Sequence, residues 1–388
     1  MRKSPVVLTL LAFTLILCSA SFATTLEYVL TNDDNPSANS GTIYKLNTTT
    51  GALTQVKVLS TGGTGLGFGF FAVNGSTVTQ NDQCIFISDP GSNDIAAFAA
   101  PSFSKTGNFS DPAFSFNGYA GGGLALTPSG KYLYASYSGS ENIGVWSVGA
   151  GCALTKVQAF VPALGADLFG AIAVDPSGKA LVIGSDSFEA ADLAAINPAT
   201  GALTDKGNVS YSSLGSCSGG CYPAGIDFTA DSEVVVFGNA TISGPSVLTA
   251  TLGSTGRLGN PQFWSMTNSA GVTNINVPFL GQAAYSTGTG YLYLGASGFG
   301  AGNPSGVITA NFTESPVSVT VAQSLRIPNP ELYQDSIAVT GSTLVTSESP
   351  SALDTFSIAA DGSLTHLLNT IDLQASGQLN FTIFPKTR

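Results

Sequence analysis

The chain has 388 residues, of which 46 are glycine and only 10% are Asp, Glu, Lys or Arg. Its formal net charge of −11 argues against nucleic acids and anionic membrane surfaces as partners, because proteins bind both through clustered Lys and Arg. The 43% content of hydrophobic residues excludes a disordered chain, since it provides ample apolar surface to bury.

The first 23 residues have the pattern of an export signal. Two basic residues precede an apolar run from Val6 to Leu17, and Ser21 and Ala23 are the small residues that a signal peptidase requires. The run is shorter than the roughly 20 residues that span a bilayer. Cleavage leaves 11 basic against 24 acidic residues, a net charge of −13. We therefore expect an extracytoplasmic protein, periplasmic or secreted, with no membrane span.

A short glycine-containing turn recurs along the predicted mature chain, residues 24–388. Its copies are Thr50–Leu53, Thr106–Phe109, Gly151–Leu154, Thr200–Leu203, Thr255–Leu258 and Asp361–Leu364. The first five copies are about 50 residues apart, and Glu314–Val317 supplies the turn missing from the last, double interval. Glycine suits a tight hairpin turn because such turns require a positive φ angle.

Each repeat contains four short runs rich in β-branched and aromatic residues, bounded by turn residues. In the third repeat these runs are 122–128, 131–137, 142–148 and 153–160. Two apolar runs joined by a Pro-Ser-Gly turn recur in phase with the glycine turns, most clearly in Leu124–Tyr134 and Ile172–Val182. Four strands in a unit of about 50 residues indicate a β-propeller rather than a sandwich or a solenoid.

The predicted innermost strands begin near residues 67, 122, 169, 222, 280 and 333. The N-terminal unit has only three runs, which are Leu26–Leu30, Thr42–Leu46 and Ala52–Val58. Its missing innermost strand is available in Leu379–Phe384. We therefore predict one all-β domain of seven four-stranded antiparallel blades, closed by the C-terminal strand joining the N-terminal blade.

Four cysteines remain after signal cleavage, an even number that suits an oxidising compartment. Cys217 and Cys221 flank Ser-Gly-Gly, a loop short enough to close on itself, which leaves Cys84 and Cys152 for a second disulfide. A zinc site is the alternative, but the paired Cys-x-x-Cys spacing that it needs is missing.

The segments Pro128–Ala135 and Asn142–Trp146, with the Gly-x-Leu-Thr turn, resemble the lactonase-type seven-bladed propellers. That family includes 6-phosphogluconolactonase-like proteins and surface proteins with Tyr-Val-Thr-Asn repeats, to which Tyr28–Asn32 is similar. The resemblance extends over essentially the whole mature chain and implies the propeller fold. Its motifs are turn and core residues, which specify a fold rather than a chemistry.

In such a propeller, two sets of loops open on one face, which we call the loop face. One set leads into the innermost strands, and the other joins the second strand of each blade to the third. The acidic residues expected there are Asp33, Asp34, Asp89, Asp94, Asp167, Asp186, Glu189, Glu331, Asp335 and Glu348. These are either solvated or, through Asp89 and Asp186, bind Ca²⁺ or Mg²⁺, since hard cations take several oxygen ligands.

A lactonase needs a metal or a general base. The only histidine, His366, falls in a predicted outermost strand far from the channel, which argues against a Ser-His-Asp triad. The base would then be a carboxylate, and the candidates are Asp335, Asp186 and Glu348. Asp335 leads into an innermost strand with apolar neighbours, where burial would raise the pKa of its carboxyl group.

Recognition of a phosphorylated sugar lactone requires clustered Arg or Lys. Arg326 is the single arginine expected on the loop face, so we do not expect phosphogluconolactonase activity. Aromatic residues near the starts of innermost strands, such as Phe169, Tyr222 and Tyr333, either pack between blades or form a platform for a sugar or an apolar ligand.

Two functions remain open. The first is a non-catalytic, monomeric module that binds a small molecule, a glycan or a protein at the loop face. The second is an extracytoplasmic hydrolase of a neutral lactone or ester, which would use carboxylates with or without a divalent cation.

Overall fold

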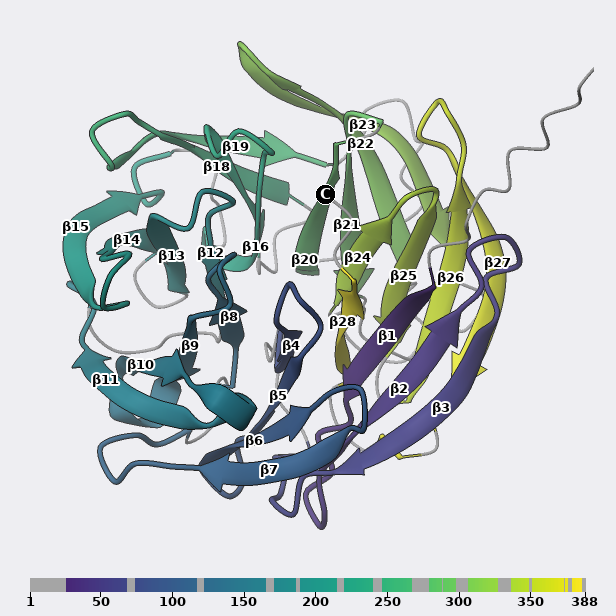
Figure 1. Ribbon diagram of the computed structural model, residues 1–388. Coiled ribbons are helices and arrows are strands. Elements are labelled where there is room, and N and C mark those ends of the chain that lie inside the picture. The colour runs from purple at the N-terminus through teal and green to yellow at the C-terminus, as the bar shows by residue number, and fades with distance from the viewer. Residues whose placement is uncertain are drawn as a thin grey trace, which may run out of the picture.

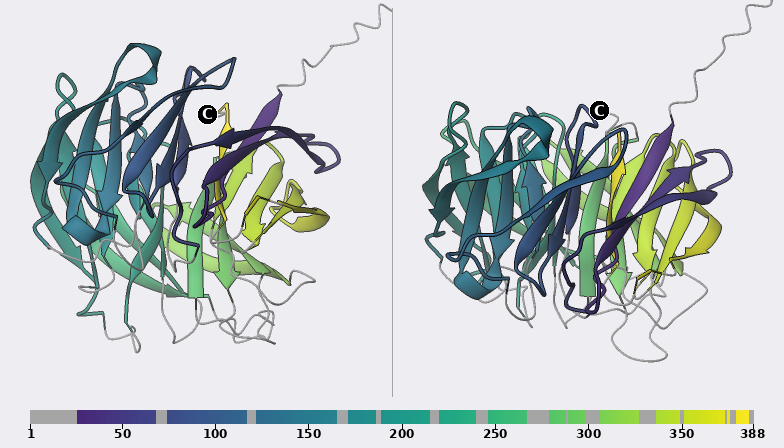
Figure 2. Two further views of the ribbon diagram at one scale, coloured as in Figure 1. Left: turned by 90° about the horizontal axis from the view of Figure 1, so that it is seen from below. Right: turned by 60° about the horizontal axis from the view of Figure 1, so that its bottom comes forward.

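The computed structural model consists of seven four-stranded antiparallel sheets arranged around a central axis (Figure 1). It describes residues 26–67, 74–116, 122–164, 171–185, 189–214, 220–239, 246–266, 279–287, 289–297, 306–326, 336–348, 351–372, 374–375 and 379–385. The sheets stand side by side, with strands that run between two opposite faces of the molecule (Figure 2). The predicted seven-bladed propeller is confirmed.

The first four blades each order their strands from the innermost outward. Blade 1 contains β28 (Asn380–Phe384), β1 (Glu27–Asn32), β2 (Ser40–Leu46) and β3 (Leu53–Ser60). Blade 2 contains β4 (Ser76–Val78), β5 (Cys84–Asp89), β6 (Asp94–Ala99) and β7 (Ser104–Phe109). Blade 3 contains β8 (Leu124–Leu126), β9 (Tyr132–Tyr137), β10 (Asn142–Val148) and β11 (Leu154–Phe160). Blade 4 contains β12 (Ile172–Val174), β13 (Ala180–Ser185), β14 (Ala190–Ile196) and β15 (Leu203–Ser210).

The last three blades follow the same order. Blade 5 contains β16 (Pro223–Phe228), β17 (Val234–Asn239), β18 (Ser246–Leu252) and β19 (Leu258–Ser265). Blade 6 contains β20 (Phe279–Ser286), β21 (Tyr291–Ser297), β22 (Gly306–Glu314) and β23 (Val317–Arg326). Blade 7 contains β24 (Ile337–Thr340), β25 (Thr343–Glu348), β26 (Ala352–Ile358) and β27 (Leu364–Ile371).

The innermost strands form a closed ring around the central axis (Figure 1). Each contacts the innermost strand of the next blade, in the order β28, β4, β8, β12, β16, β20, β24 and back to β28. Blade 1 closes the ring, because β28 pairs with β1 in a register that places Tyr28 opposite Phe384 and Asn32 opposite Asn380. The predicted role of the C-terminal strand is therefore confirmed.

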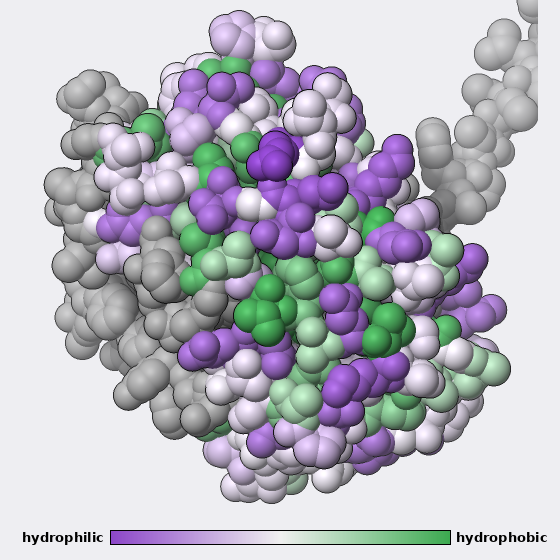
Figure 3. Space-filling model, turned by 90° about the vertical axis from the view of Figure 1, so that its left-hand side faces the viewer, coloured by the Kyte–Doolittle hydropathy of each residue, from purple (hydrophilic) through white to green (hydrophobic). Residues whose placement is uncertain are grey.

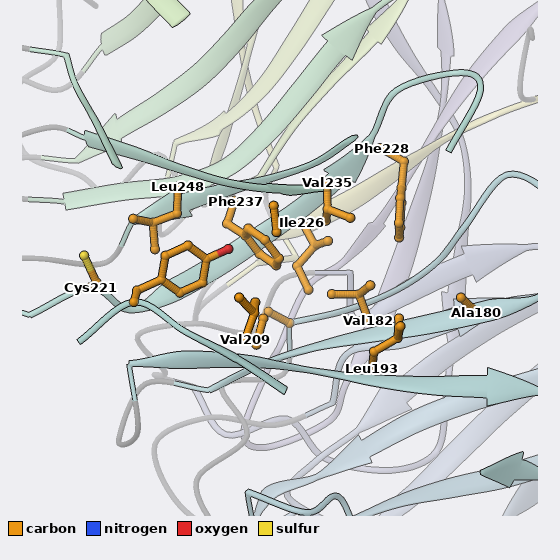
Figure 4. Close-up of a cluster of buried hydrophobic side chains, with 14 residues drawn as sticks. Ala180, Val182, Leu193, Val209, Cys221, Ile226, Phe228, Val235, Phe237 and Leu248 are labelled. Carbon is orange, nitrogen blue, oxygen red and sulfur yellow. The ribbon is translucent and has the colours of Figure 1, made fainter. Parts of the chain in front are cut away.

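The hydrophobic cores lie between neighbouring blades, since alternate residues of a strand face opposite sides of its sheet. Between blades 4 and 5, Val182 and Leu193 pack against Ile226, Phe237 and Leu248 (Figure 4). The outer rim mixes hydrophilic and hydrophobic side chains on the side that Figure 3 shows. No helix among the described residues is long and apolar enough to cross a membrane.

Two predicted boundaries are wrong. The segment Thr106–Phe109 is part of strand β7 rather than a hairpin turn, because Pro101 and Phe103, which has a positive φ of 52°, make the turn before β7. The innermost strand of blade 2 begins at Ser76 instead of near residue 67. The turn that Asn74 and Gly75 make before Ser76 fits this later start, since Asn and Gly both favour turns.

A disulfide joins Cys84 to Cys152, as predicted from the sequence. Cys84 begins β5 of blade 2, and Cys152 lies in the hairpin before β11 of blade 3. The bridge therefore ties two neighbouring blades together on the face opposite the loop face. Cys221 is also in a disulfide, and its predicted partner Cys217 lies outside the described residues.

Candidate functional site

Three loops at blades 1 and 2 are joined by backbone hydrogen bonds on the loop face. The amide of Gly65 donates to the carbonyl of Asn35 (2.7 Å), and the amide of Asn39 donates to the carbonyl of Gly63 (2.9 Å). The amide of Gly91 donates in turn to the carbonyl of Thr64 (2.8 Å). This joined set of loops adjoins Asp33, Asp34 and Asp89, three of the acidic residues that the sequence placed on this face.

Asp33 follows strand β1 and is completely buried. Its carboxyl oxygens accept hydrogen bonds from the hydroxyl groups of Thr31, Ser40 (2.7 Å) and Thr42 (3.1 Å). The Thr31 hydroxyl also lies 3.4 Å from Asp372 Oδ2, so the two carboxyl groups share one small polar environment between blades 1 and 7. Burial, followed by repulsion from Asp372, raises the pKa of Asp33 to about 7.

Asp89 ends strand β5 and is also completely buried, at the boundary between blades 1 and 2. Its Oδ1 atom accepts a hydrogen bond from Asn39 Nδ2 (2.8 Å), whereas Oδ2 has no hydrogen-bond partner among the described residues. Burial raises the pKa of Asp89 to about 8, and the neighbouring Asp94 contributes in the same direction. Both groups are stabilised as neutral acids rather than as carboxylates.

These findings change the prediction for the acidic loops. Asp33, Asp34 and Asp89 lie on the loop face as predicted, but all three are buried, so solvated acidic loops are the wrong description for them. Within the part of the chain that the structure describes, no three His, Cys, Asp or Glu side chains converge as ligands of a metal ion. Asp186, the predicted second metal ligand, lies outside that part, so the Ca²⁺ or Mg²⁺ site stays a prediction.

Carboxamide side chains from several blades lie near the loop-face ends of the inner strands. Asn32 Nδ2 donates to the carbonyl oxygens of Gly75 (3.1 Å) and Ser88 (2.9 Å), which links blade 1 to blade 2. Asn32 Oδ1 accepts a hydrogen bond from Asn39 Nδ2 (2.9 Å). Asn380 begins β28 and lies against Gly75, since a Cβ atom built at Gly75 would be 2.8 Å from both Asn380 Oδ1 and Asn32 Nδ2.

Gln282 connects non-adjacent blades. Its Nε2 atom donates to Asn74 Oδ1 (3.0 Å) in blade 2, and its Oε1 atom accepts a hydrogen bond from the Ile337 amide (3.3 Å) in blade 7. Strand β20 of Gln282 and strand β4, which follows Asn74, are not neighbours in the ring, so the first of these bonds crosses the channel. We call Asn32, Asn74, Gln282 and Asn380 the amide cluster.

Several other predicted site residues fall in parts of the chain that the structure does not describe. Asp186, Asp335, Phe169 and Tyr333 lie outside the described residues. Glu348 ends β25 and Arg326 ends β23, both at the loop face, but their side chains are not among those described. Their catalytic and ligand-binding roles remain predictions.

Tyr222 precedes β16 at the channel mouth, as predicted, and is half-buried. Its amide donates to Asn239 Oδ1 (2.6 Å), and its ring packs over Gly220, where an added Cβ atom would be 2.2 Å from the ring. The hydrogen bond to the Asn239 side chain and this packing fix the position of Tyr222 before β16.

His366 lies in the outermost strand β27, as predicted. Its Nε2 atom is 2.7 Å from Asp354 Oδ1, and its ring packs edge-on against Phe356 with a centroid separation of 5.1 Å. Asp354 is completely buried in blade 7. The only histidine of the chain therefore contacts Asp354 and Phe356 at the periphery of the propeller.

Asp372, Asn39 and the four residues of the amide cluster were not predicted from the sequence. Asn74 could have been noticed, because Asn-Gly before a strand is a turn signal. Gln282 had no such local signal, since its hydrogen-bond partner Asn74 is 208 residues away.

Residues 92–217 match the sequence model of a family described as "Lactonase, 7-bladed beta-propeller". The resemblance to the lactonase-type propellers is confirmed. Among solved structures, the chain is similar to a protein of Bacteroides fragilis provisionally named a 6-phosphogluconolactonase (17% identity, 93% of this chain and 99% of the other, TM-score 0.70). It is similar also to the periplasmic gluconolactonase of Pseudomonas aeruginosa (14% identity, 92% and 99%, TM-score 0.70). At these identities the likeness establishes the fold alone. No curated protein sequence matches that of the chain.

Proposed function

We propose that this lactonase-type propeller is an extracytoplasmic binding protein whose loop face holds a neutral, hydroxylated small molecule without transforming it. One observation supports this most directly: Asp33, Asp89 and Asp372 on the loop face are buried and accept hydrogen bonds from the protein itself. Asp33, Asp89 and Asp372 are at most 1% exposed, so a substrate bound on the surface has no direct access to them.

The electrostatics argue against an anionic ligand. Among the described residues, the two ion pairs join Lys156 to Asp111 and His366 to Asp354, and neither lies at the channel. Lys105 donates to the carbonyl of Thr61 beside the joined loops, but it lies on the outermost strand β7. Phosphate recognition uses convergent Arg or Lys side chains, whereas the channel mouth presents neutral amides and the aromatic Tyr222.

An extracytoplasmic location is supported by the cysteines. The disulfide between Cys84 and Cys152 and the bonded state of Cys221 suit an oxidising compartment. The similar gluconolactonase of Pseudomonas aeruginosa is periplasmic, and the first 23 residues have the pattern of an export signal.

Hydrolysis of a neutral lactone is the second candidate function. It is favoured by the match of residues 92–217 to the lactonase family. Asp335, Asp186 or Glu348 would then supply the general base, and Asp89 with Asp186 would hold a Ca²⁺ or Mg²⁺ ion that polarises the ester carbonyl.

One experiment separates the two functions. The mature protein is titrated calorimetrically with neutral aldoses, their methyl glycosides, their 1,5-lactones and the corresponding 6-phosphates, and lactone hydrolysis is followed with and without EDTA. We expect saturable binding of a neutral member, no binding of its 6-phosphate, and hydrolysis no faster than in buffer. Hydrolysis that is abolished by Asp335→Asn, Asp186→Asn or EDTA would establish the hydrolase instead.

A further inference from the structure

The outermost strand of each blade is the edge of its sheet, and an unpaired edge can pair with a strand of another chain. Proteins commonly prevent such pairing with a charged residue or a proline on the edge. Five of the seven outermost strands carry one, namely Lys57 in β3, Lys105 in β7, Lys156 in β11, Lys206 in β15 and Pro261 in β19. Strand β23 has only Arg326, at its end, and β27 has no Asp, Glu, Lys, Arg or Pro. The edges of blades 6 and 7 are therefore the least protected.

Strand β27 also exposes large apolar side chains. Leu368 is 42% and Ile371 is 63% exposed, whereas β23 has no exposed large hydrophobic residue among those described. Strand β11 exposes Val157 (38%), but the preceding residue is Lys156. Among the outermost strands, β27 thus combines an uncharged edge with exposed apolar groups.

These two apolar side chains lie on opposite faces of the blade 7 sheet. Leu368 is opposite Thr355 in β26, and Ile371 is opposite Ala352. Thr355 and Ala352 are an odd number of residues apart, so they face opposite sides of the sheet. The Thr355 hydroxyl donates to the carbonyl of Gly51 (3.0 Å), which places Leu368 on the side of blade 1. A strand added to this edge would therefore bury apolar surface on both faces.

The edge of β27 is open within the part of the chain that the structure describes. The strand lies at the periphery of the propeller (Figure 1), and the blade 7 sheet ends with it. Its one histidine, His366, contacts Asp354 and Phe356 of its own blade.

We propose that β27 is a self-association site, through which two copies of the chain pair edge to edge. The two β27 strands run antiparallel about a two-fold axis at Leu368, so that the two four-stranded blades form one sheet of eight strands. This dimer takes the place of the monomer expected from the sequence.

The charge of the protein favours a second copy as the occupant of this edge. Each chain has a net charge of −11, so two copies repel each other wherever acidic surfaces would meet. Pairing β27 with itself places no like charges opposite each other, and it places the two Leu368 side chains in contact. A basic or acidic partner strand would find no charge to complement. A two-fold interface is also the commonest arrangement of identical chains.

The antiparallel pairing determines how the two propellers are oriented. The strands of each blade run between the loop face and the opposite face (Figure 2). Reversing one β27 relative to the other therefore reverses one propeller. The two loop faces open in opposite directions, and association leaves both of them accessible.

Sedimentation velocity of the mature protein over a series of concentrations tests this inference. The variants are Leu368→Lys and Ile371→Lys, each of which adds a charge to the exposed edge of β27. The control is Val157→Lys, at a residue of similar exposure on β11, an edge that already carries Lys156. All three positions are exposed, so the melting temperature measured at low concentration should stay close to that of the wild-type protein.

We expect a wild-type dimer whose proportion rises with concentration. Each β27 variant should raise the dissociation constant of the dimer at least about tenfold, because two added lysines face each other across the axis and apolar burial is lost. Val157→Lys should dissociate as the wild-type protein does.

A cysteine at the proposed axis tests the identity of the paired strand. The Cα atoms of residues directly opposite in an antiparallel pair are about 4.5–5.5 Å apart, which is within the range that a disulfide spans. Leu368→Cys should therefore form a covalent dimer under mild oxidation, and Val157→Cys should not.

Two kinds of result would overturn the inference. A wild-type protein that is monomeric at every concentration would leave the edge of β27 to a strand of another protein. A dimer that survives both lysine substitutions, or that cross-links as readily through Val157→Cys as through Leu368→Cys, would use a different surface. Neither result bears on ligand binding at the loop face, which is measured separately.

Discussion

Buried acids determine how individual residues of the loop face respond to pH. Asp33 and Asp89 are completely buried, and hydrogen bonds from hydroxyl or amide groups only partly replace the water they lose. Neither is in an ion pair among the described residues, so the neutral form is favoured and the pKa of each rises far above 3.8. Their protonation therefore contributes to folding.

We predict that Asp33→Asn and Asp89→Asn make the protein less sensitive to rising pH. The raised pKa values, about 7 and about 8, mean that the folded protein binds more protons than the unfolded chain between about pH 4 and about pH 8. The free energy of unfolding of the wild-type protein should therefore fall as the pH rises through this range. Asparagine cannot ionise, so the free energy of unfolding of each variant should not fall in this way. Relative to the wild-type protein, each variant should therefore become more stable by about 1–3 kcal/mol as the pH rises from 5 to 8.

Thermal unfolding at pH 5 and pH 8 measures this effect. Asp361→Asn is the control, because Asp361 is exposed and hydrogen bonds from Ser363 lower the pKa of its carboxyl group. The Asp361 carboxyl group is ionised at both pH values. The stability of Asp361→Asn should therefore change with pH by the same amount as that of the wild-type protein. If Asp33→Asn and Asp89→Asn showed the same pH dependence of stability as the wild-type protein, Asp33 and Asp89 would be ionised in the folded protein.

Individual turns could be predicted from the sequence where a residue within the turn marks them. Gly51, Gly201 and Gly362 have φ angles of 73–77° in the turns where the sequence placed them, because only glycine adopts that conformation without strain. The turn before β7 has no such glycine, because Pro101 and Phe103 form it, and its predicted position was therefore wrong. A glycine inside a strand, such as Gly107, has the same local appearance as one in a turn.

We predict that replacing both Cys84 and Cys152 by serine lowers the free energy of unfolding by about 4 kcal/mol. The bridged cysteines are 68 residues apart, so the disulfide restricts a long loop in the unfolded chain. Chemical denaturation of the variant and the wild-type protein measures the difference. Reductant should destabilise the wild-type protein more than the double variant, in which only the bridge at Cys221 remains to be reduced. Equal sensitivity to reductant would contradict a stabilising role of this bridge.

At the scale of the whole molecule, the repeat period was sufficient to predict the number of blades and the closing strand. Leu379–Phe384 could be assigned to the first blade because that blade lacked one strand and the chain end had a β pattern. The sites between blades were not predictable in this way. The repulsion between Asp33 and Asp372 and the bond from Gln282 to Asn74 involve residues that only closure of the ring brings together. Sequence spacing fixes the order of the blades, but not which polar groups meet between them.

The closing strand β28 should determine the stability of the whole ring. Deleting residues 379–388 removes β28 and exposes the edge of β1 to solvent. The deletion also removes Leu379, Phe381, Ile383 and Phe384, all at most 6% exposed. Burial of four such side chains contributes about 6–12 kcal/mol, which is comparable to the total stability of a domain. We therefore expect the truncated protein to lose cooperative unfolding and to aggregate through its open edge.

Two further proteins test whether closure of the ring is what makes unfolding cooperative. Deleting only residues 386–388 leaves β28 whole and should not change the unfolding transition. In a circularly permuted protein, residues 379–385 are joined through a short Gly-Ser linker to residue 26, and the chain ends at residue 372. This protein should recover the cooperative unfolding transition of the wild type. The register permits this order, because Phe384 lies opposite Tyr28 and the two rings stack with centroids 5.4 Å apart. Calorimetric unfolding distinguishes the four proteins. A truncated protein as cooperative as the wild type would mean that β28 is dispensable, and that the remaining strands hold the ring together without it.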